Sequence, residues 1–402
     1  ILTAAGLSAS RVQILVLKDS SLNAFVTDNQ DIFINSGLIR KLDTPGMLQS
    51  VIAHEAAHIA NGHITRRLTN ARSARTATGL GILLSAAVAA SGNAQAAGGL
   101  AAGAAGSARR VFLRNTRAEE SSADQSGARF LASAGVDPGE MIKVLDIFRG
   151  QEALSVARQD PYARTHPIWS ARLRAVRGYA AAYTPRGAPQ PDRDFWFARV
   201  RGKLNAMAGN PARALRQLRG AENNTITLMQ RAVAYSRLPD TDKALENVNA
   251  LISRRPADPY AHELKGKILL EARRFQAAVR AYARAVDLAP RQALILAGYG
   301  RALLALKTGS GNRRALEALE RARARDPQQP RMLRDLALAY ARSGNNGMAS
   351  LATAERYALL GRLDDAALHA ERASGLLARG STSWNRAQDV LVAARAANSQ
   401  RR

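Results

Sequence analysis

The spacing of hydrophobic positions changes several times along the 402-residue chain. In RVQILVL, Val12, Ile14 and Val16 alternate with other residues, and NAFV and DIFI then flank the polar segment TDNQ. Alternation with period two predicts strands, and a polar turn between two such runs predicts a hairpin. We therefore expect strands up to about residue 43.

The next segment has the period of a helix. Thr44 is of a type that caps helix N-termini, and Pro45 suits the first helical position. Leu48, Ile52 and Ile59 then fall on one helix face. Further helices are expected to carry RAEESSADQSG and DPYARTHPIWSARL downstream. The first part of the chain thus combines a small sheet with helices.

The segment Gly79–Ser107 holds no charged residue and is rich in alanine and glycine. Its strongest apolar run, GLGILLSAAVAA, is too short to span a bilayer. One interpretation is an Ala/Gly loop or a buried helical hairpin. The other is a segment that touches the membrane surface or covers an active site.

The second half of the chain repeats itself. Gly266, Tyr282 and Pro290 fall at the spacing of a tetratricopeptide (TPR) unit, and the preceding unit ends at Pro256, 34 residues before Pro290. The two helices of such a unit pack closely, so small residues are needed where they cross. This pattern predicts a stack of helical pairs, which presents a surface for binding protein segments.

A Pro/Gly-rich stretch, YTPRGAPQPDRD, separates the two halves and is typical of a linker. We therefore expect a mainly α protein with three parts. An α+β domain with a small sheet covers residues 1–182, the linker covers residues 183–194, and an α-helical TPR solenoid covers residues 195–402.

The chain is strongly basic, with 58 Lys and Arg against 32 Asp and Glu and a formal charge of +26. This charge favours acidic partners, whether nucleic acid, an anionic membrane surface or acidic protein patches. Nucleic-acid binders usually interleave aromatic residues or carry a recognisable module, and aromatic residues are only 5% here. We expect no nucleic-acid partner. An arginine-rich surface without a specific partner is the alternative.

Two histidines and a glutamate occur together in VIAHEAAHIA. The chain has no cysteine, so a metal must be held by His, Asp or Glu. His54 and His58 lie one turn apart on the same helix face, so both imidazoles can reach one ion. Glu55 can take a proton from water at such a zinc ion. The pattern predicts a catalytic zinc site, and chance co-occurrence is the alternative.

A third ligand must come from elsewhere in the chain. In EESSAD, Glu120 and Asp124 share one helix face. A ligand at Glu120, with Asp124 orienting a ligand histidine, fits the outer partners that metal sites need. Taken alone, such an acidic stretch is more often a solvated surface. His63 lies five residues after His58, on another helix face, so we expect a helix-end residue there.

Two residues near RTHPIW have more than one interpretation. His166 either packs at the turn before Pro167 or approaches the zinc. There it would stabilise the oxyanion of the scissile carbonyl or occupy the open coordination site. Arg172 could hold an acidic side chain or the substrate carbonyl, or lie on the surface. The segment Asn23–Ile34 could present an edge strand on which an extended substrate lies.

His54-Glu55-x-x-His58 followed by Glu120-x-x-x-Asp124 resembles the gluzincin metallopeptidases, which include HtpX and the prenyl-protein (CAAX) proteases. LNAFV, IFINSGLI, HEAAHIANGH, EESSAD and RTHP are similar to their soluble, periplasmic, TPR-bearing relatives of the BepA type. The resemblance covers nearly the whole chain. It implies one Zn²⁺ per chain, bound by His54, His58 and Glu120, with Glu55 as general base.

The same resemblance implies proteolysis in protein quality control, directed at outer-membrane proteins in the periplasm, with the signal peptide outside this chain. HtpX-like members carry transmembrane helices, and this sequence shows no run of that length, so we do not expect membrane insertion. Peripheral membrane contact through Gly79–Ser107, or a cover over the site, is the hypothesis for the segment between the two motifs.

Three functions follow from these patterns. We favour a zinc endopeptidase that hydrolyses misfolded or stalled proteins, with TPR repeats that recruit clients or an outer-membrane assembly machine. A chaperone or adaptor with a latent, gated protease site is the alternative. A basic solenoid that binds nucleic acid is the least favoured.

Overall fold

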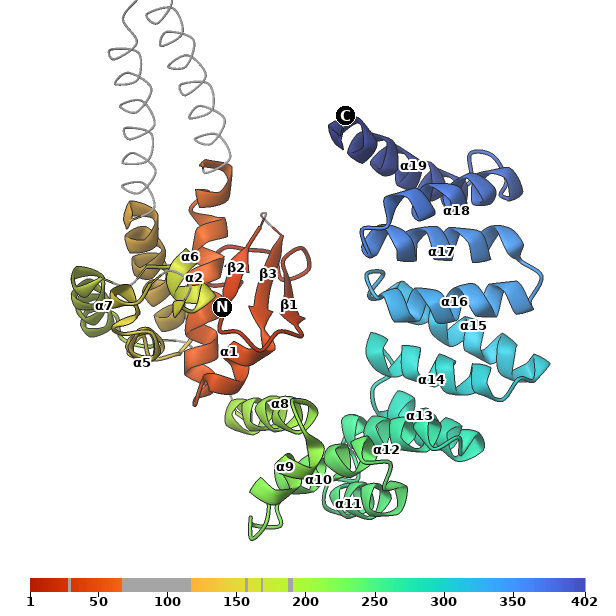
Figure 1. Cartoon of the computed structure of the whole chain (residues 1–402), viewed down its shortest axis with the longest axis horizontal. Helices are drawn as coiled ribbons and strands as arrows, with labels where there is room; N and C mark the ends of the chain where they lie inside the picture. Colours follow the sequence, from red (N-terminus) through yellow and green to blue (C-terminus); the bar gives the residue numbers. More distant parts are fainter. Residues whose placement is uncertain (28–29, 67–116, 156–157, 168, 187–190, 402) are drawn as a thin grey trace, which may run out of the picture. The chain divides into compact units, whose positions relative to one another are not determined.

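A computed structural model describes residues 1–27, 30–66, 117–155, 158–167, 169–186 and 191–401. These residues form two compact units, Ile1–Leu204 and Asn205–Arg402 (Figure 1). Most of the described residues are helical, and the sheet found among them has three strands, which confirms the predicted mainly α class. The segment Gly79–Ser107 lies outside the described residues.

The sheet contains β1 (Gln13–Leu17), β2 (Ala24–Val26) and β3 (Asp31–Asn35) in the order β1-β3-β2. β3 is parallel to β1 and antiparallel to β2, which confirms the predicted hairpin. Because β3 lies in the middle, β1 and β2 are both edge strands. The alternation of the sequence is visible in β3, where Ile32 and Ile34 are buried.

The first correction concerns residues just after the sheet. We expected strands up to about residue 43, but Ser36–Lys41 forms a short helix, α1. The loop before β2 satisfies its N-terminus, because the Ser36 hydroxyl and the Gly37 N–H both donate to the Asp19 carbonyl. A Cβ at Gly37 would lie 2.1 Å from the Ser20 carbonyl oxygen, so only glycine fits there. The local periodicity of hydrophobic residues does not predict this tertiary contact.

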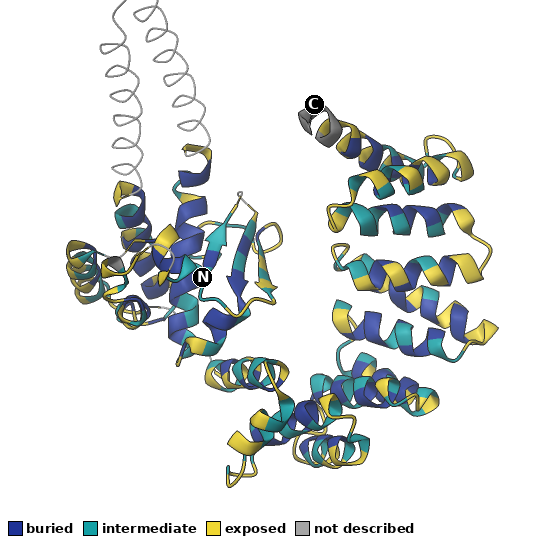
Figure 2. Ribbon diagram, in the orientation of Figure 1, coloured by how far each residue is buried: buried dark blue, intermediate teal, exposed yellow. Residues whose placement is uncertain are grey.

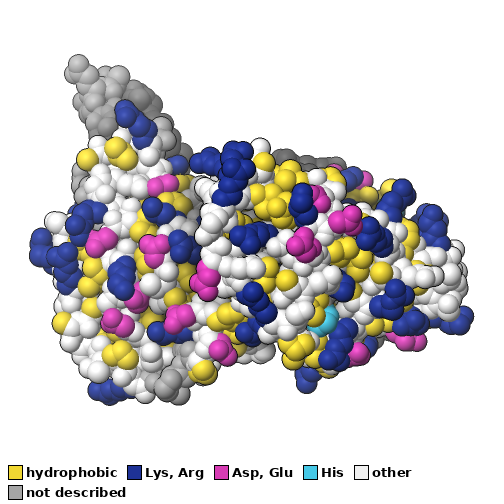
Figure 3. All heavy atoms as spheres, turned by 90° about the horizontal axis from the view of Figure 1, so that it is seen from below, with side chains coloured by type: hydrophobic (Ala, Val, Ile, Leu, Met, Phe, Trp, Pro, Cys, Tyr) yellow, Lys and Arg dark blue, Asp and Glu magenta, His cyan; other side chains and the backbone are white. Residues whose placement is uncertain are grey.

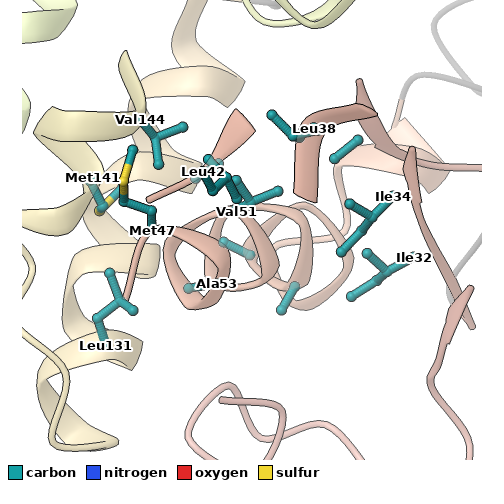
Figure 4. Packing of buried hydrophobic residues seen from close by; sticks show 14 of the residues in the cluster. Ile32, Ile34, Leu38, Leu42, Met47, Val51, Ala53, Leu131, Met141 and Val144 are labelled. Carbon is teal, nitrogen blue, oxygen red and sulfur yellow. The ribbon is translucent and has the colours of Figure 1, made fainter. Parts of the chain in front are cut away.

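The central element of the first unit is α2 (Pro45–Ala60). Thr44 caps it as predicted, since its side chain accepts a hydrogen bond from the Met47 N–H. Most of α2 is buried, as expected for a helix surrounded by other elements. Figure 4 shows Ile32 and Ile34 of the sheet on one side of α2 and Met141 and Val144 of α5 (Glu140–Ile147) on the other.

The remaining helices of this unit place later residues beside α2. A helix at residues 117–133 approaches α2 closely, because a Cβ at Gly127 would lie 3.5 Å from the Ala53 backbone. The Tyr162 N–H donates to the Leu22 carbonyl and so fastens α6 (Pro161–Thr165) to the segment before β2. The other elements are η1 (Gln151–Ala153), α6 (Pro161–Thr165), α7 (Ser170–Ala182) and α8 (Arg193–Met207), the last crossing the boundary between the units.

The second unit is a succession of antiparallel helices, most of which have a buried and an exposed face (Figure 2). Three of them begin at residues 225, 259 and 293, so the predicted period of 34 residues is confirmed. The helices are α9 (Pro211–Gln217), α10 (Thr225–Arg237), α11 (Thr241–Arg254), α12 (Pro259–Glu271), α13 (Phe275–Leu288), α14 (Ala293–Ala305), α15 (Gly309–Arg323), α16 (Pro330–Arg342), α17 (Asn346–Leu359), α18 (Leu363–Leu376) and α19 (Thr382–Arg401).

The small residues of the repeats do what the sequence pattern requires. The Tyr282 ring lies between α12 and α14, where a Cβ at Gly266 would come within 2.6 Å of it and a Cβ at Gly298 within 2.4 Å. Both glycines therefore leave room for one aromatic ring. Among the described residues, no helix is both long enough and apolar enough to cross a membrane.

Candidate metal centre

Four side chains with metal-binding atoms meet in the interior of the first unit. His54 and His58 lie on α2, and Glu120 lies on the helix at residues 117–133. His166 is the C-cap residue of α6. One ligand atom from each lies within 4.8 Å of the others, and all four residues are buried. We call these four residues the metal cluster.

The spacing of these atoms suits a single ion. His54 Nε2 lies 3.1 Å from His58 Nε2, 3.2 Å from His166 Nδ1 and 3.3 Å from Glu120 Oε2. Glu120 Oε1 lies 3.4 Å from His58 Nε2, and Glu120 Oε2 lies 3.0 Å from His166 Nδ1. Ligands about 2.0–2.1 Å from a tetrahedral zinc ion are themselves about 3.3–3.4 Å apart. The donor set, three imidazoles and a carboxylate, is one that zinc accepts.

A second layer of charged groups holds the metal cluster in place. Asp124 Oδ1 lies 3.0 Å from His54 Nδ1, the nitrogen that faces away from the cluster. Arg172 donates two hydrogen bonds to Asp124, from Nε at 2.7 Å and Nη2 at 3.0 Å. Its Nη1 lies 3.1 Å from Glu120 Oε2 and donates to the His166 carbonyl at 3.1 Å. Arg172 therefore joins both acidic residues to the turn that carries His166.

Burial and the neighbouring charges shift the pKa values of His54, His58 and Glu120. With the imidazoles counted as neutral, Glu55, Glu120, Asp124 and Arg172 together carry a formal charge of −2, which a divalent cation would balance. Burial alone would lower the pKa of His54, but Asp124 and Glu120 outweigh it and raise this pKa to about 9. Burial and the neighbouring histidines lower the pKa of His58 to about 3. Although burial opposes it, His166 and Arg172 hold the pKa of Glu120 well below its usual range.

Glu55 stands apart from the other acidic groups. Both of its carboxylate oxygens are buried without a hydrogen-bond partner among the described residues, although His166 Nε2 lies 3.3 Å from Oε1. Glu55 lines a cleft of about 370 Å³ together with His58, His166 and Thr165, and with residues of the edge strand β2. The carboxylate thus faces the space beside the metal cluster. Another cleft, about 400 Å³ between the start of α2 and α8, contains none of these residues.

All seven residues that the sequence singled out lie in this one region: His54, Glu55, His58, Glu120, Asp124, His166 and Arg172. His63 follows the end of α2, as expected, but the prediction that it lies away from His58 on another helix face was wrong. Its side chain is buried, and its Nδ1 lies 2.9 Å from Nδ1 of His58. The signal was Gly62, which takes a left-handed φ of 67° and turns the chain out of the path of α2.

Known proteins are similar to both parts of the chain. Residues 1–180 match Peptidase family M48, and residues 229–293 and 299–349 match the tetratricopeptide repeat. The Beta-barrel assembly-enhancing protease of Escherichia coli is 28% identical over 378 residues, which cover 91% of this chain and 75% of that protein. The protein of that name in Yersinia pestis is 27% identical over 186 residues, which cover 46% of this chain and 38% of that protein.

The solved structures that resemble the chain cover a smaller part of it. A crystal structure of MamA is 19% identical, covers 42% of this chain and 93% of its own, and has a TM-score of 0.32. MamA from Desulfovibrio magneticus is 22% identical, with 42% and 96% coverage and a TM-score of 0.35. The family matches are the more informative finding: the first part of the chain is similar to Peptidase family M48, and two later stretches are similar to the tetratricopeptide repeat.

Proposed function

We propose that the first unit is a zinc-dependent endopeptidase. The observation that carries this proposal is a buried set of three imidazoles and a carboxylate whose ligand atoms lie within 4.8 Å of one another, beside a buried carboxylate, Glu55, that lacks a hydrogen-bond partner among the described residues. A metallopeptidase needs a Lewis-acid metal and a general base side by side, and these residues could hold the first and supply the second.

We assign each residue one role in the hydrolysis of a peptide bond. His54, His58 and Glu120 hold the ion, and Asp124 and Arg172 keep His54 and Glu120 in place. Zinc, when bound, supplies a Lewis acid that polarises the scissile carbonyl and lowers the pKa of water to about 7. Glu55 removes a proton from the attacking water and delivers it to the departing amine nitrogen, so its carboxylate must be free to accept a hydrogen bond.

The substrate is proposed to lie along β2. Asn35 N–H donates to the Asn23 carbonyl, so hydrogen-bonded pairs alternate from that position, and the Phe25 backbone faces β3. The backbone groups of Ala24 and Val26 then face away from β3, and of the two residues Ala24 is fully buried whereas Val26 is partly exposed and lines the cleft. An extended peptide that pairs with the Val26 backbone would pass the cleft that holds Glu55 and His166.

A second candidate, a latent protease whose site is gated, is favoured by the position of His166. Its Nδ1 lies 3.2 Å from His54 Nε2 and 3.0 Å from Glu120 Oε2, the spacing of a fourth zinc ligand. A catalytic zinc site keeps that fourth position for water or substrate. In this gated form, His166 would have to leave the zinc before a peptide bond could be hydrolysed. The binding of clients by the repeats would not require that movement.

The cellular role is proposed from the names of the relatives. We propose that the chain acts in the periplasm on misfolded or stalled outer-membrane proteins, and that its repeats bind clients or an assembly machine. The surface in Figure 3 has Lys and Arg side chains spread among Asp and Glu rather than gathered in one patch. The proposals of peripheral membrane contact through Gly79–Ser107 and of no nucleic-acid partner rest on the sequence.

The experiment compares metal content and cleavage of an unfolded protein, such as casein, between the native chain and Glu55→Gln. One zinc per chain in both forms is expected, with turnover about 10²–10⁴-fold lower in Glu55→Gln because it lacks the general base. Protein purified without chelators that contains no zinc would refute the metal centre. Equal cleavage by both forms would refute the role of Glu55.

His166→Ala distinguishes the open from the gated form. If His166 occupies the fourth coordination position, its removal should raise turnover while zinc stays bound by the other three residues. If His166 instead stabilises the oxyanion, turnover should fall about 10²–10³-fold. The measurement is kcat/KM on a peptide substrate, with zinc content checked in parallel.

A further inference from the structure

The two histidines of α2 have different partners on the side away from the metal cluster. His54 presents Nδ1 to the carboxylate of Asp124 at 3.0 Å. His58 presents Nδ1 to another imidazole, with His63 Nδ1 at 2.9 Å. The rings of His58 and His63 meet edge to face, with centroids 5.0 Å apart, and both residues are only 1% exposed.

The metal-binding role of His58 determines which of the two rings donates the hydrogen bond between them. His58 Nε2 points to the metal cluster, 3.1 Å from His54 Nε2 and 3.4 Å from Glu120 Oε1. To bind an ion there, Nε2 must keep its lone pair, so the proton of the neutral His58 ring lies on Nδ1. The His58 Nδ1–H then donates to His63 Nδ1, and the proton of the His63 ring lies on Nε2.

A break in α2 makes the contact possible. On an uninterrupted helix, five residues turn a side chain about 140° away from the first, so His63 would point elsewhere. Instead α2 ends at Ala60, Gly62 adopts a φ of 67°, and residues 63–66 start a new helical turn. The Arg66 N–H donates to the Gly62 carbonyl, which belongs to this new turn.

The break is anchored to the helix that carries Glu120. The Asn61 side-chain amide donates to the Ser122 carbonyl at 3.4 Å, to the Ser122 hydroxyl at 3.0 Å and to the Ser126 hydroxyl at 3.2 Å. Asn61 precedes Gly62, and Ser122 lies between Glu120 and Asp124 in the sequence. The place of His63 is therefore set by the same two helices that supply three members of the metal cluster.

We propose that His63 is a positioning residue for the metal centre. It accepts the hydrogen bond of His58 Nδ1–H and so holds the His58 ring in the tautomer and orientation that present Nε2 to the ion. His63 is not itself a member of the metal cluster, because it contacts the outer nitrogen of His58. This inference rests on the proposed zinc-dependent function and deepens it.

The test measures zinc affinity of the full chain by competition with a chromogenic chelator. His63→Leu removes the acceptor and keeps an apolar side chain. His63→Asn places its carbonyl oxygen near the position of Nδ1 and can accept the same hydrogen bond. Outer partners of zinc ligands typically contribute 10–100-fold to affinity, so we expect His63→Leu to weaken binding at least tenfold and His63→Asn to restore it to within about threefold of native.

Two further measurements separate positioning from a general loss of structure. Circular dichroism and thermal unfolding of the metal-free variants should be alike for His63→Leu and His63→Asn. The visible spectrum of the Co²⁺-loaded protein should change in His63→Leu and stay native in His63→Asn. His262→Leu, in the repeat unit, controls for loss of a histidine, since the His262 side chain hydrogen-bonds to the Pro256 carbonyl of that unit and its loss should leave zinc affinity unchanged.

Native affinity in His63→Leu would overturn the inference, and so would equal losses in the folded Leu and Asn variants. If His63→Leu does not fold, His63→Gln replaces it. The carbonyl of this glutamine lies one methylene further from the backbone than that of asparagine. Weaker zinc binding by His63→Gln than by His63→Asn would support the positioning role of His63. Equal zinc affinities of the two variants would overturn that role. A native chain that binds no zinc would refute the proposed function itself, whereas zinc binding that no His63 variant alters would refute only this inference.

Discussion

The two units of the protein bury different kinds of side chain. The first unit buries four histidines, several carboxylates and Arg172, most of them in and around the metal cluster. In the described part of the repeat unit, the buried charged residues are Asp258, which caps α12, and Asp335, which pairs with Arg301. The remaining core of the repeats is formed largely by alanine, leucine and other apolar side chains.

This difference shows how each unit holds together. A buried charge destabilises a fold unless it is paired, so the site of the first unit depends on contacts between residues far apart in the sequence. His166 and His54, for example, are separated by 112 positions. In the repeats, contacts such as that between Tyr282 and Gly266 join neighbouring helices. We therefore expect mutations to act through charge in one unit and through packing and local helix geometry in the other.

The largest expected effect on stability is at Arg172. Arg172→Leu leaves Asp124 and Glu120 buried without their cation, which should lower the free energy of unfolding by about 3–5 kcal/mol. Urea unfolding of the metal-free protein would measure it. Arg362→Ala in the repeats is the control, because its pair with Asp365 is about half exposed and should contribute less than about 1 kcal/mol. Similar losses in both variants would contradict the comparison.

Removal of the metal should sharpen the contrast between the units. Zinc at about 100 times its Kd stabilises the state that binds it by about 3 kcal/mol. Chelation should therefore increase hydrogen exchange in α2 and in the helix at residues 117–133, and leave α12–α15 unchanged. Hydrogen–deuterium exchange with mass spectrometry would localise the effect. Equal changes in both units would show that the metal does not act through the cluster.

In the repeats, Gly298→Ala should be the most damaging small substitution. The new Cβ would lie 2.4 Å from the Tyr282 ring, and overpacking of this kind lowers the free energy of unfolding by about 1–3 kcal/mol. Gly375→Ala is the matched control in α18. Nothing lies within 4 Å of its Cβ position, so alanine there should raise the free energy of unfolding by about 0.5–1 kcal/mol. Thermal unfolding should thus shift in opposite directions, and a shared direction would refute the packing argument.

The smallest effect concerns a helix cap. The Asn224 side chain accepts hydrogen bonds from the N–H groups of Ile226 and Thr227, so Asn224→Ala should destabilise α10 by about 1 kcal/mol. Gln292 occupies the same N-cap position at α14, but its side chain makes no capping hydrogen bond. Gln292→Ala should therefore lower the free energy of unfolding by less than about 0.5 kcal/mol. Denaturant midpoints of the two variants should therefore differ. Neither change should alter peptide cleavage.

Much of the site was already present in local sequence. His54 and His58 are four residues apart, as are Glu120 and Asp124, and helix geometry alone places each pair on one face. The period of 34 residues in the sequence likewise predicted the repeats. These inferences succeeded because each depends on spacing within one helix or one repeat, where bond geometry determines which side chains are neighbours.

Tertiary structure decided the rest. The position of His166 depends on α6, which the Tyr162 N–H fastens to the Leu22 carbonyl, and helix α1 depends on the Asp19 carbonyl of the loop before β2. His63 was misplaced because one left-handed glycine, Gly62, reverses what helical spacing predicts. Where a chain leaves a helix and which element it then meets depend on packing against residues far away in sequence. Periodicity carries no information about those contacts, and the sequence alone therefore determined the two halves of the site but not how they meet.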